Sequence, residues 1–251
     1  MTRAVERAAH ILLALASGTP RLGVSEIAEL VEVPKPTVHT VLRTLERQGL
    51  VVQEVGGGKY ALGPAVLRLG NAYLDGSQLR ARSASWTDTL ARQTGEAVWV
   101  GVLSGDHVVV VHHALRPDDL VQILEVGAAI PWHTCALGHA IVACLDDATQ
   151  KALLTAPARR LTGRTVTDPE ALRQALVTAR ERGYAVEDQA ATLGDAGLAS
   201  PVSDWSGRVV GAIGIVGPVE RLLTPAGRRV RLADAVRSTA RALSRDLGAG
   251  R

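Results

Sequence analysis

A proline at position 36 fixes where a helix can begin in the N-terminal quarter of the chain. Because proline lacks a backbone N–H, an α-helix tolerates it only in the first turn. Apolar residues follow at helical spacing and form one side of the expected helix: Val38, Val41, Leu42 and Leu45. Gly49 comes next and suits the end of a helix. The pattern therefore predicts a helix that starts near Lys35 and buries one face.

The opposite side of this expected helix is polar and cationic. It carries Lys35, Thr37, His39, Thr40, Arg43 and Arg47. Hydrogen-bonding side chains flanked by cations suit the base edges and phosphates of a DNA major groove. The alternative is a structural helix whose charged face simply contacts water. The segments before and after this helix help to decide between a DNA-binding helix and a structural one.

Two further helices are expected before this one. The inner side of the first would consist of Val5, Ala8, Ile11, Leu12 and Leu15. Gly18-Thr19-Pro20 would end it. A second helix is predicted from about Val24 to Leu30, with Glu26 placed favourably near its N-terminus. Its buried side would consist of Ile27, Ala28 and Leu30.

Two short β-strands are predicted after the third helix, at residues 50–53 and 59–62. The turn between them contains three glycines, 56–58, followed by Lys59. A glycine-rich tip that carries a lysine suits a wing lying along a phosphate backbone. The order helix, helix, turn, helix, hairpin predicts a winged helix-turn-helix domain at residues 1–64.

Composition excludes several classes of protein. Hydrophobic residues make up 47% of the 251, which permits a sizeable core and argues against disorder. The longest apolar runs fall far short of the roughly 20 residues of a membrane helix. The N-terminus lacks the features of a signal peptide, so we expect a cytoplasmic protein without membrane contact. The net charge of +3 alone does not identify a nucleic-acid binder.

A helical connector is expected at residues 65–80. Helical patterns at 65–74 and 79–93 are interrupted by Asp75-Gly76-Ser77. The connector can present Leu67, Leu69 and Leu74 to a partner chain. It can equally be a rigid spacer within one chain.

The remaining residues, 81–251, mix β-rich and helical segments. Strands are predicted at 97–103, 108–114, 121–126, 184–187, 198–203 and 209–216. Helices are predicted at 136–145, 148–154, 170–182 and 225–247. Strands grouped around a helical insert, followed by a long helix, indicate an α+β fold with a sheet covered by helices. Cys135 and Cys144 form no close-spaced metal or redox pair and are expected to be small buried residues.

Long motifs in the N-terminal part occur in a characteristic order. They are Ser25-Glu26-Ile27-Ala28-Glu29, Val33-Pro34-Lys35-Pro36-Thr37-Val38-His39, Leu42-Arg43-Thr44-Leu45-Glu46-Arg47-Gln48-Gly49 and Lys59-Tyr60-Ala61-Leu62-Gly63-Pro64. They resemble the helix-turn-helix and the wing exit of IclR-family transcriptional regulators. The candidate contacts to double-stranded DNA are then Ser25, Lys35, Pro36, Thr37, His39, Thr40, Arg43, Arg47 and Lys59.

Motifs in the second domain extend the resemblance over essentially the whole chain. They are Gly95-Glu96-Ala97-Val98, Leu137-Gly138-His139-Ala140, Arg182-Gly183-Tyr184-Ala185-Val186 and Gly207-Arg208-Val209-Val210-Gly211-Ala212-Ile213. They look like the IclR effector domain, which has a GAF-like α/β fold and binds small, often acidic, metabolites. Segments 67–71, 79–82, 116–119 and 244–251 are similar to one subgroup, the glycerol-operon repressors of actinomycetes. That likeness implies glycerol 3-phosphate or glycerol as the effector.

The resemblance also implies where an effector would bind. In relatives that bind small keto acids, four places line the pocket, and they correspond here to Ala136 and Leu137, Glu187 and Asp188, Gly197, and Gly214 and Val216. Gly197 stands where those relatives have a cysteine, and Gly214 and Val216 stand where they have serines. A keto-acid effector is therefore disfavoured, because a buried carboxylate without donors is costly. The pocket would be roomier and more apolar.

Replacement donors for an anion are available near residue 136. His133, Thr134 and Cys135 precede an expected helix, and backbone N–H groups at a helix N-terminus favour an anion. His112, His113 and Arg116 would add positive charge if they point inward. The alternative for each histidine is a surface or satisfied residue, and for Arg116-Pro117-Asp118-Asp119 a solvated turn.

Other classes of function have less support. The chain contains no nucleophile elbow, phosphate-cradling glycine loop or zinc-protease motif, so we expect no catalytic residues, metal or cofactor. A DNA-binding architectural protein with an inert second domain stays an alternative, distinguished by DNA binding that ignores ligands. We expect a homodimer, or a dimer of dimers, on a near-palindromic operator, since two-fold symmetry doubles the contacts. An effector would shift the arrangement of the connector helices, and repression is the expected outcome of DNA binding.

Overall fold

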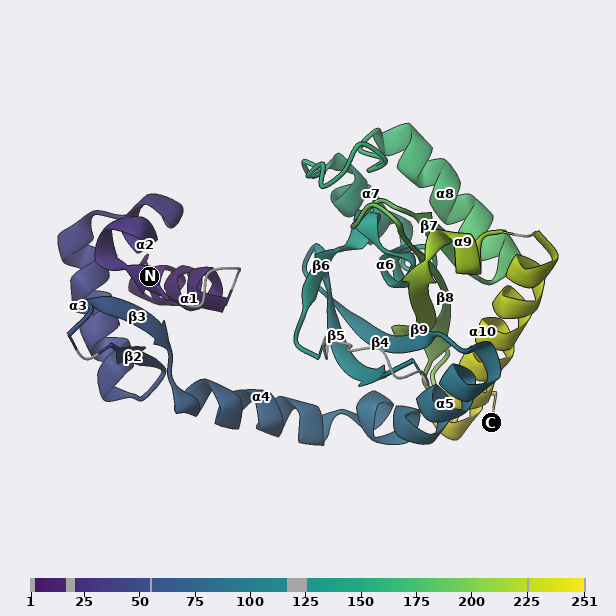
Figure 1. Ribbon diagram of the computed structural model, residues 1–251, viewed down its shortest axis with the longest axis horizontal. Coiled ribbons are helices and arrows are strands. Elements are labelled where there is room, and N and C mark those ends of the chain that lie inside the picture. The colour runs from purple at the N-terminus through teal and green to yellow at the C-terminus, as the bar shows by residue number, and fades with distance from the viewer. Residues whose placement is uncertain (1–2, 17–20, 55, 117–125, 225, 251) are drawn as a thin grey trace. The chain divides into compact units, whose positions relative to one another are not determined.

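The structure is a computed structural model that describes residues 3–16, 21–54, 56–116, 126–224 and 226–250. It contains two compact units, Met1–Gly76 and Ser77–Arg251, and each has its own core (Figure 1). The predicted helix break at 18–20, most of the predicted strand at 121–126 and the turn at 117–119 lie outside the described residues.

The first unit combines helices with a three-stranded sheet. Its helices are α1 (Arg3–Ala16), α2 (Val24–Leu30), α3 (Lys35–Arg47) and α4 (Pro64–Gly76), and its strands are β1 (Leu22–Gly23), β2 (Val51–Gln53) and β3 (Lys59–Leu62). β3 lies between β1 and β2 and pairs with both in antiparallel fashion. Helices α1, α2 and α3 pack on one another, and the β2–β3 hairpin follows them. The predicted winged helix-turn-helix is confirmed.

The core of this unit lies between the three helices and the sheet. Its almost fully buried members include Ile11, Ile27, Val38, Leu42 and Tyr60. Two predicted core positions are wrong, since Val5 is 64% exposed and Leu30 is 63% exposed. On α1 the core contacts begin one turn later, at Ala8, and beyond α2 the chain turns so that Val31 and Val33 pack against the core instead.

The second unit is built on a six-stranded antiparallel sheet in the order β6-β5-β4-β9-β8-β7. The strands are β4 (Ala97–Ser104), β5 (His107–Ala114), β6 (Ala129–Pro131), β7 (Ala185–Asp188), β8 (Asp195–Ser203) and β9 (Val209–Pro218). The helices are α5 (Gln78–Thr94), α6 (Ala136–Val142), α7 (Asp147–Thr155), α8 (Pro169–Arg182), α9 (Val219–Leu222) and α10 (Ala226–Asp246), with a 3₁₀ turn at Trp132–Thr134. Helices α5 and α10 pack on one face of the sheet, and α6 packs on the other with α8 behind it (Figure 1). This is the predicted α+β class.

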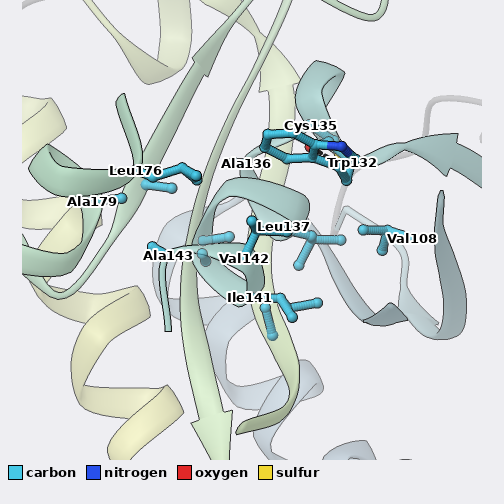
Figure 2. Packing of buried hydrophobic residues seen from close by; sticks show 14 of the residues in the cluster. Val108, Trp132, Cys135, Ala136, Leu137, Ile141, Val142, Ala143, Leu176 and Ala179 are labelled. Carbon is cyan, nitrogen blue, oxygen red and sulfur yellow. Dashed lines mark hydrogen bonds between the residues drawn. The ribbon is translucent and has the colours of Figure 1, made fainter. Parts of the chain in front are cut away.

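Helix α6 is buried along its whole length. All seven of its residues are buried, and Leu137, Ile141 and Val142 lie among the apolar side chains of the core (Figure 2). Gly138 makes this possible, because a Cβ at that position would lie 2.1 Å from the carbonyl oxygen of Trp132. The helix can therefore lie directly against the turn that precedes it.

Helix α5 is joined to the start of α10 by a buried carboxylate. Glu96 follows α5 and is fully buried, and its Oε1 lies 3.0 Å from Arg221 Nε and 3.0 Å from Arg228 Nη2. Arg221 also donates to the carbonyl oxygen of Gly95 at 2.8 Å. The two guanidinium groups offset part of the cost of burying the carboxylate, whose Oε2 is buried without a hydrogen-bond partner among the described residues.

We expect Gly138→Ala to destabilise the second unit, because the new Cβ meets the backbone of the preceding turn rather than a side chain that can move. The free energy of unfolding should fall by about 2 kcal/mol or more, as for other overpacked sites. Gly163→Ala is the matched control, since no atom lies within 4 Å of a Cβ there, and it should change stability little. Chemical denaturation of the full chain measures both, and equal midpoints for the two variants would contradict the packing argument.

Candidate DNA-binding surface and effector cavity

One side of α3 carries the candidate DNA contacts. Val38, Leu42 and Leu45 are buried, and at 100° per residue Arg43 and Arg47 point away from them. Lys35, Pro36, His39, Thr40, Arg43 and Arg47 are exposed, and Thr37 is half-buried. The Thr40 hydroxyl donates to the Pro36 carbonyl oxygen at 2.9 Å, which leaves its oxygen able to accept a bond. The structure thus brings most of the predicted contact residues onto one exposed helix face.

The wing and the start of α2 add two more candidate contacts. Lys59 is exposed where β3 begins, and Ser25 is exposed in the first turn of α2. Gly56 and Gly58 adopt positive φ angles of 80° and 65°, so the tight tip requires them. At the base of the wing Arg21 forms an ion pair with Glu54, which sequence reasoning missed. That pair neutralises Arg21 and leaves Lys59 as the cation of the wing.

A cavity of about 310 Å³ lies in the second unit between α6 and the sheet. Eight of the nine predicted effector-binding residues line it: Thr134, Cys135, Ala136, Leu137, Glu187, Gly197, Gly214 and Val216. They come from the start of α6 and from strands β7, β8 and β9. The volume falls at the lower end of the roughly 300–1,000 Å³ typical of ligand pockets, so the space suits a small molecule.

The ninth predicted residue, His133, is not part of this cavity. Its Nε2 donates to the carbonyl oxygen of Arg159 at 2.9 Å, and its side chain lines a separate recess. The neighbouring His139 donates from Nε2 to the His133 carbonyl oxygen at 3.1 Å. Burial lowers the pKa of His139 to about 4, so its ring is neutral near pH 7.

The three other groups proposed to attract an anion do not line the cavity. His112, His113 and Arg116 are not among the described lining residues. His113 lies on the same side of the sheet as its cross-strand neighbour Trp99, with ring centroids 5.8 Å apart. Besides burial, two charges on α5 act on the pKa of His112: that of Arg80 lowers it and that of Asp88 raises it. Burial lowers the pKa of both histidines, and each therefore stays uncharged near pH 7.

Cys135 caps α6 with its thiol. Sγ accepts the Gly138 N–H at 3.4 Å, and burial raises the thiol pKa to about 12. The thiol therefore stays protonated at neutral pH and is a poor nucleophile. Its role here is to cap the N-terminus of α6 and to line the cavity.

Glu187 is the buried carboxyl group of the cavity. Burial raises its pKa to about 7, although the backbone N–H groups of Ala190 and Ala191 counteract that effect in part. Oε1 accepts the Ala190 N–H, and Oε2 lies 3.7 Å from where a Cβ on Gly197 would be. The side chain is thus about half ionised at neutral pH and borders the cavity lining.

The two glycines at the family's polar positions have different environments. A Cβ on Gly214 would lie 2.5 Å from the Leu198 carbonyl oxygen, so glycine lets β8 and β9 approach closely. A Cβ on Gly197 would lie 3.3 Å from the Ala136 Cβ, which brings α6 close to β8. The side chains lost here are partly replaced by closer packing.

Sequence reasoning missed several lining residues. They are Trp99, Ala128, Ala129, Ile130, Pro131, Leu161, Ala191, Thr192, Asp195, Leu198, Ala199 and Ile215. The alternation within β4 could have placed Trp99 on the inner face. No motif marks Ile130, Leu161 or Thr192, because only the sheet order brings their segments to the cavity.

Two family models match the chain. The one described as IclR helix-turn-helix domain matches residues 4–55, and the one described as Bacterial transcriptional regulator IclR C-terminal matches residues 71–245. The second covers more than half of the 251 residues. The chain belongs to the IclR family of transcriptional regulators.

Relatives in the IclR family match over the full length. Glycerol operon regulatory proteins of Streptomyces griseus and Streptomyces coelicolor are each 46% identical over 249 residues, which is 99% of this chain and 98% of theirs. The crystal structure of an IclR regulator from Silicibacter sp. TM1040 has a TM-score of 0.85 at 26% identity and covers 98% of this chain and 97% of its own. These families and relatives are transcriptional regulators, not enzymes.

Two structural features bear on alternative roles for this IclR protein. Within the described ranges, no cluster of three His, Cys, Asp or Glu side chains could hold a metal ion. None of the described helices combines the length and apolar character needed to cross a bilayer.

For the DNA-binding surface of this IclR regulator, we expect Arg43→Ala to weaken operator binding about tenfold per contact removed, without loss of stability. Arg43 is exposed, and no hydrogen bond or ion pair holds it among the described residues. Arg241→Ala, an exposed arginine of α10, is the matched control and should leave affinity unchanged. Fluorescence anisotropy at fixed salt gives the affinities, and circular dichroism checks the fold. Equal affinities for the two variants would remove Arg43 from the contact surface.

For the cavity of this IclR regulator, we expect Glu187→Gln to change how stability depends on pH. Because the folded-state pKa is raised to about 7, the carboxyl favours folding below its ordinary pKa, and this contribution is lost as pH rises through 7. Glutamine carries no such dependence. The free energy of unfolding of Glu187→Gln minus that of the wild type should therefore rise between pH 5 and pH 8.5, by up to about 3 kcal/mol.

Urea unfolding at several pH values measures this gain. Glu181→Gln on the exposed side of α8 is the matched control and should give a pH-independent difference from wild type. Parallel pH curves for Glu187→Gln and wild type would show that Glu187 keeps its ordinary pKa.

Proposed function

We propose that this regulator represses a glycerol operon and is controlled by glycerol or glycerol 3-phosphate bound in the cavity. The observation that carries the proposal is a cavity of about 310 Å³ in the same chain as an exposed DNA-contact helix. Full-length relatives at 46% identity are named glycerol operon regulatory proteins, which supports the metabolic assignment. A role on DNA implies that the protein acts in the cytoplasm.

The DNA site is proposed to be near-palindromic and bound by a homodimer or a dimer of dimers. One exposed helix and one wing lysine offer few contacts, and a two-fold axis doubles them. Helix α4 supports self-association, because none of its described residues is buried and Leu67 and Leu69 are 67% and 63% exposed. Apolar side chains on a helix without a buried face favour a partner over water.

A route from the cavity to the connector is available within the second unit. β9 contributes Gly214 and Val216 to the cavity, and Val216 pairs with Ala97 at the start of β4. Glu96 precedes Ala97 and is fixed by Arg221 and Arg228, directly after α5. A ligand that shifts β9 is thus proposed to displace the C-terminal end of α5 and, through the length of this helix, its N-terminal end, which follows α4 and the DNA-binding unit in the chain.

The test is a titration of the full chain against labelled DNA taken from upstream of its own gene. Fluorescence anisotropy is measured at one salt concentration, since phosphate contacts make affinity strongly salt-dependent. We expect saturable binding that glycerol or glycerol 3-phosphate shifts, because ligand and DNA binding are coupled. Tight binding that ignores both compounds would refute the proposed control by effector.

A further inference from the structure

The charged groups that line the cavity are acidic. Glu187 and Asp195 contribute carboxyl groups, and no described lysine, arginine or histidine belongs to the lining. Within the described lining, an anion in this space would meet negative charge without a compensating cation.

The histidines close to the cavity do not change this balance. His133 is bound to the Arg159 carbonyl oxygen in another recess, and His139 is held neutral by burial. His112 and His113 are likewise kept uncharged by burial. Arg116 lies outside the described lining.

The start of α6 is also a weak anion site. The Cys135 thiol accepts the Gly138 N–H and contacts the Leu137 N–H, so the cap is already occupied from within the chain. The helix has only seven residues, which limits its dipole. The Gly138 N–H is therefore not free to replace a cation.

One polar group in the wall matches a hydroxyl group. The Glu187 carboxyl group borders the lining, where Oε2 lies 3.7 Å from the position that a Cβ on Gly197 would take. Its Oε1 accepts the Ala190 N–H. A carboxylate oxygen accepts a hydrogen bond from the hydroxyl group of an alcohol.

We infer that the cavity takes an uncharged polyol, glycerol, in preference to its phosphate ester, and that Glu187 is the residue that rejects the anion. The inference rests on the proposed function and selects between its two ligands. A carboxylate in a poorly hydrated cavity repels a nearby anion more strongly than one in water. The rest of the wall is mostly apolar and offers an anion few donors.

Isothermal titration calorimetry on the full chain tests this at pH 6 and pH 8 with glycerol, glycerol 3-phosphate and glycerate. Glycerate is included because its charge stays constant over this range, whereas a phosphate monoester titrates near pH 6. In wild type we expect glycerol to bind and each anion to bind at least about tenfold more weakly at pH 8. The ratio of the Kd of glycerate to the Kd of glycerol should rise from pH 6 to pH 8, because Glu187 loses its proton over this range.

Three variants complete the design. Glu187→Gln should tighten both anions about tenfold at pH 8, and its side-chain carbonyl can still accept the Ala190 N–H. Thr192→Lys adds a cation at an exposed lining position and should also favour the anions. Glu181→Gln, exposed on α8, is the matched control and should change nothing. Thermal unfolding without ligand verifies that each variant is folded.

The outcomes separate the inference from the proposed function. Glycerol 3-phosphate binding more tightly than glycerol, with no change in Glu187→Gln, would overturn the inference and leave control by a glycerol metabolite intact. Failure of all three compounds to bind folded wild type would overturn both.

Discussion

The second unit depends on the close approach of α6 to the sheet, and glycines permit it. A Cβ on Gly138 would lie 2.1 Å from the Trp132 carbonyl oxygen, and one on Gly101 would lie 2.5 Å from Val108 Cγ1 and 3.3 Å from Leu137 Cδ1. With Gly197 facing Ala136, the helix is held where its first turn can line the cavity while its remaining residues fill the core. The cavity is thus the space that this packing leaves at the start of α6.

The strands around that space connect it to the end of α5. β9 lies between β4 and β8, so a change in its position acts on the pair Ala97–Val216 as well as on the cavity wall. Glu96, one residue before Ala97, is fully buried and held by two arginines of the C-terminal helices. A buried carboxylate with two fixed partners resists small independent movements. Under the proposed control by an effector, the strand start and the end of α5 would move together.

Much of this architecture could be predicted from the sequence, for identifiable physical reasons. Pro36 and the spacing of Val38, Leu42 and Leu45 define α3 locally, and the glycines of the wing define a turn. Leu30 was wrongly placed in the core, because periodicity does not reveal where the chain turns after a short helix. β6 and the lining residues Ile130 and Leu161 could not be predicted, since only long-range pairing brings them to the cavity. The alternation of side chains along β4 could have predicted that Trp99 lies on the inner face of the sheet.

The electrostatics of the cavity were the feature hardest to predict from the sequence, because they depend on which face of its strand or helix each side chain occupies. His112, His113 and His133 are basic residues near the right place in the sequence, yet burial and a carbonyl partner leave none of them as a cation on the wall. Glu187, by contrast, is buried at the wall, where its ionisation opposes folding above neutral pH. A group kept at a cost to stability is more readily explained by ligand selection than by packing, since glutamine would fill the same volume. Under the proposed function, the charge of the wall, more than its shape, selects between glycerol and its phosphate ester.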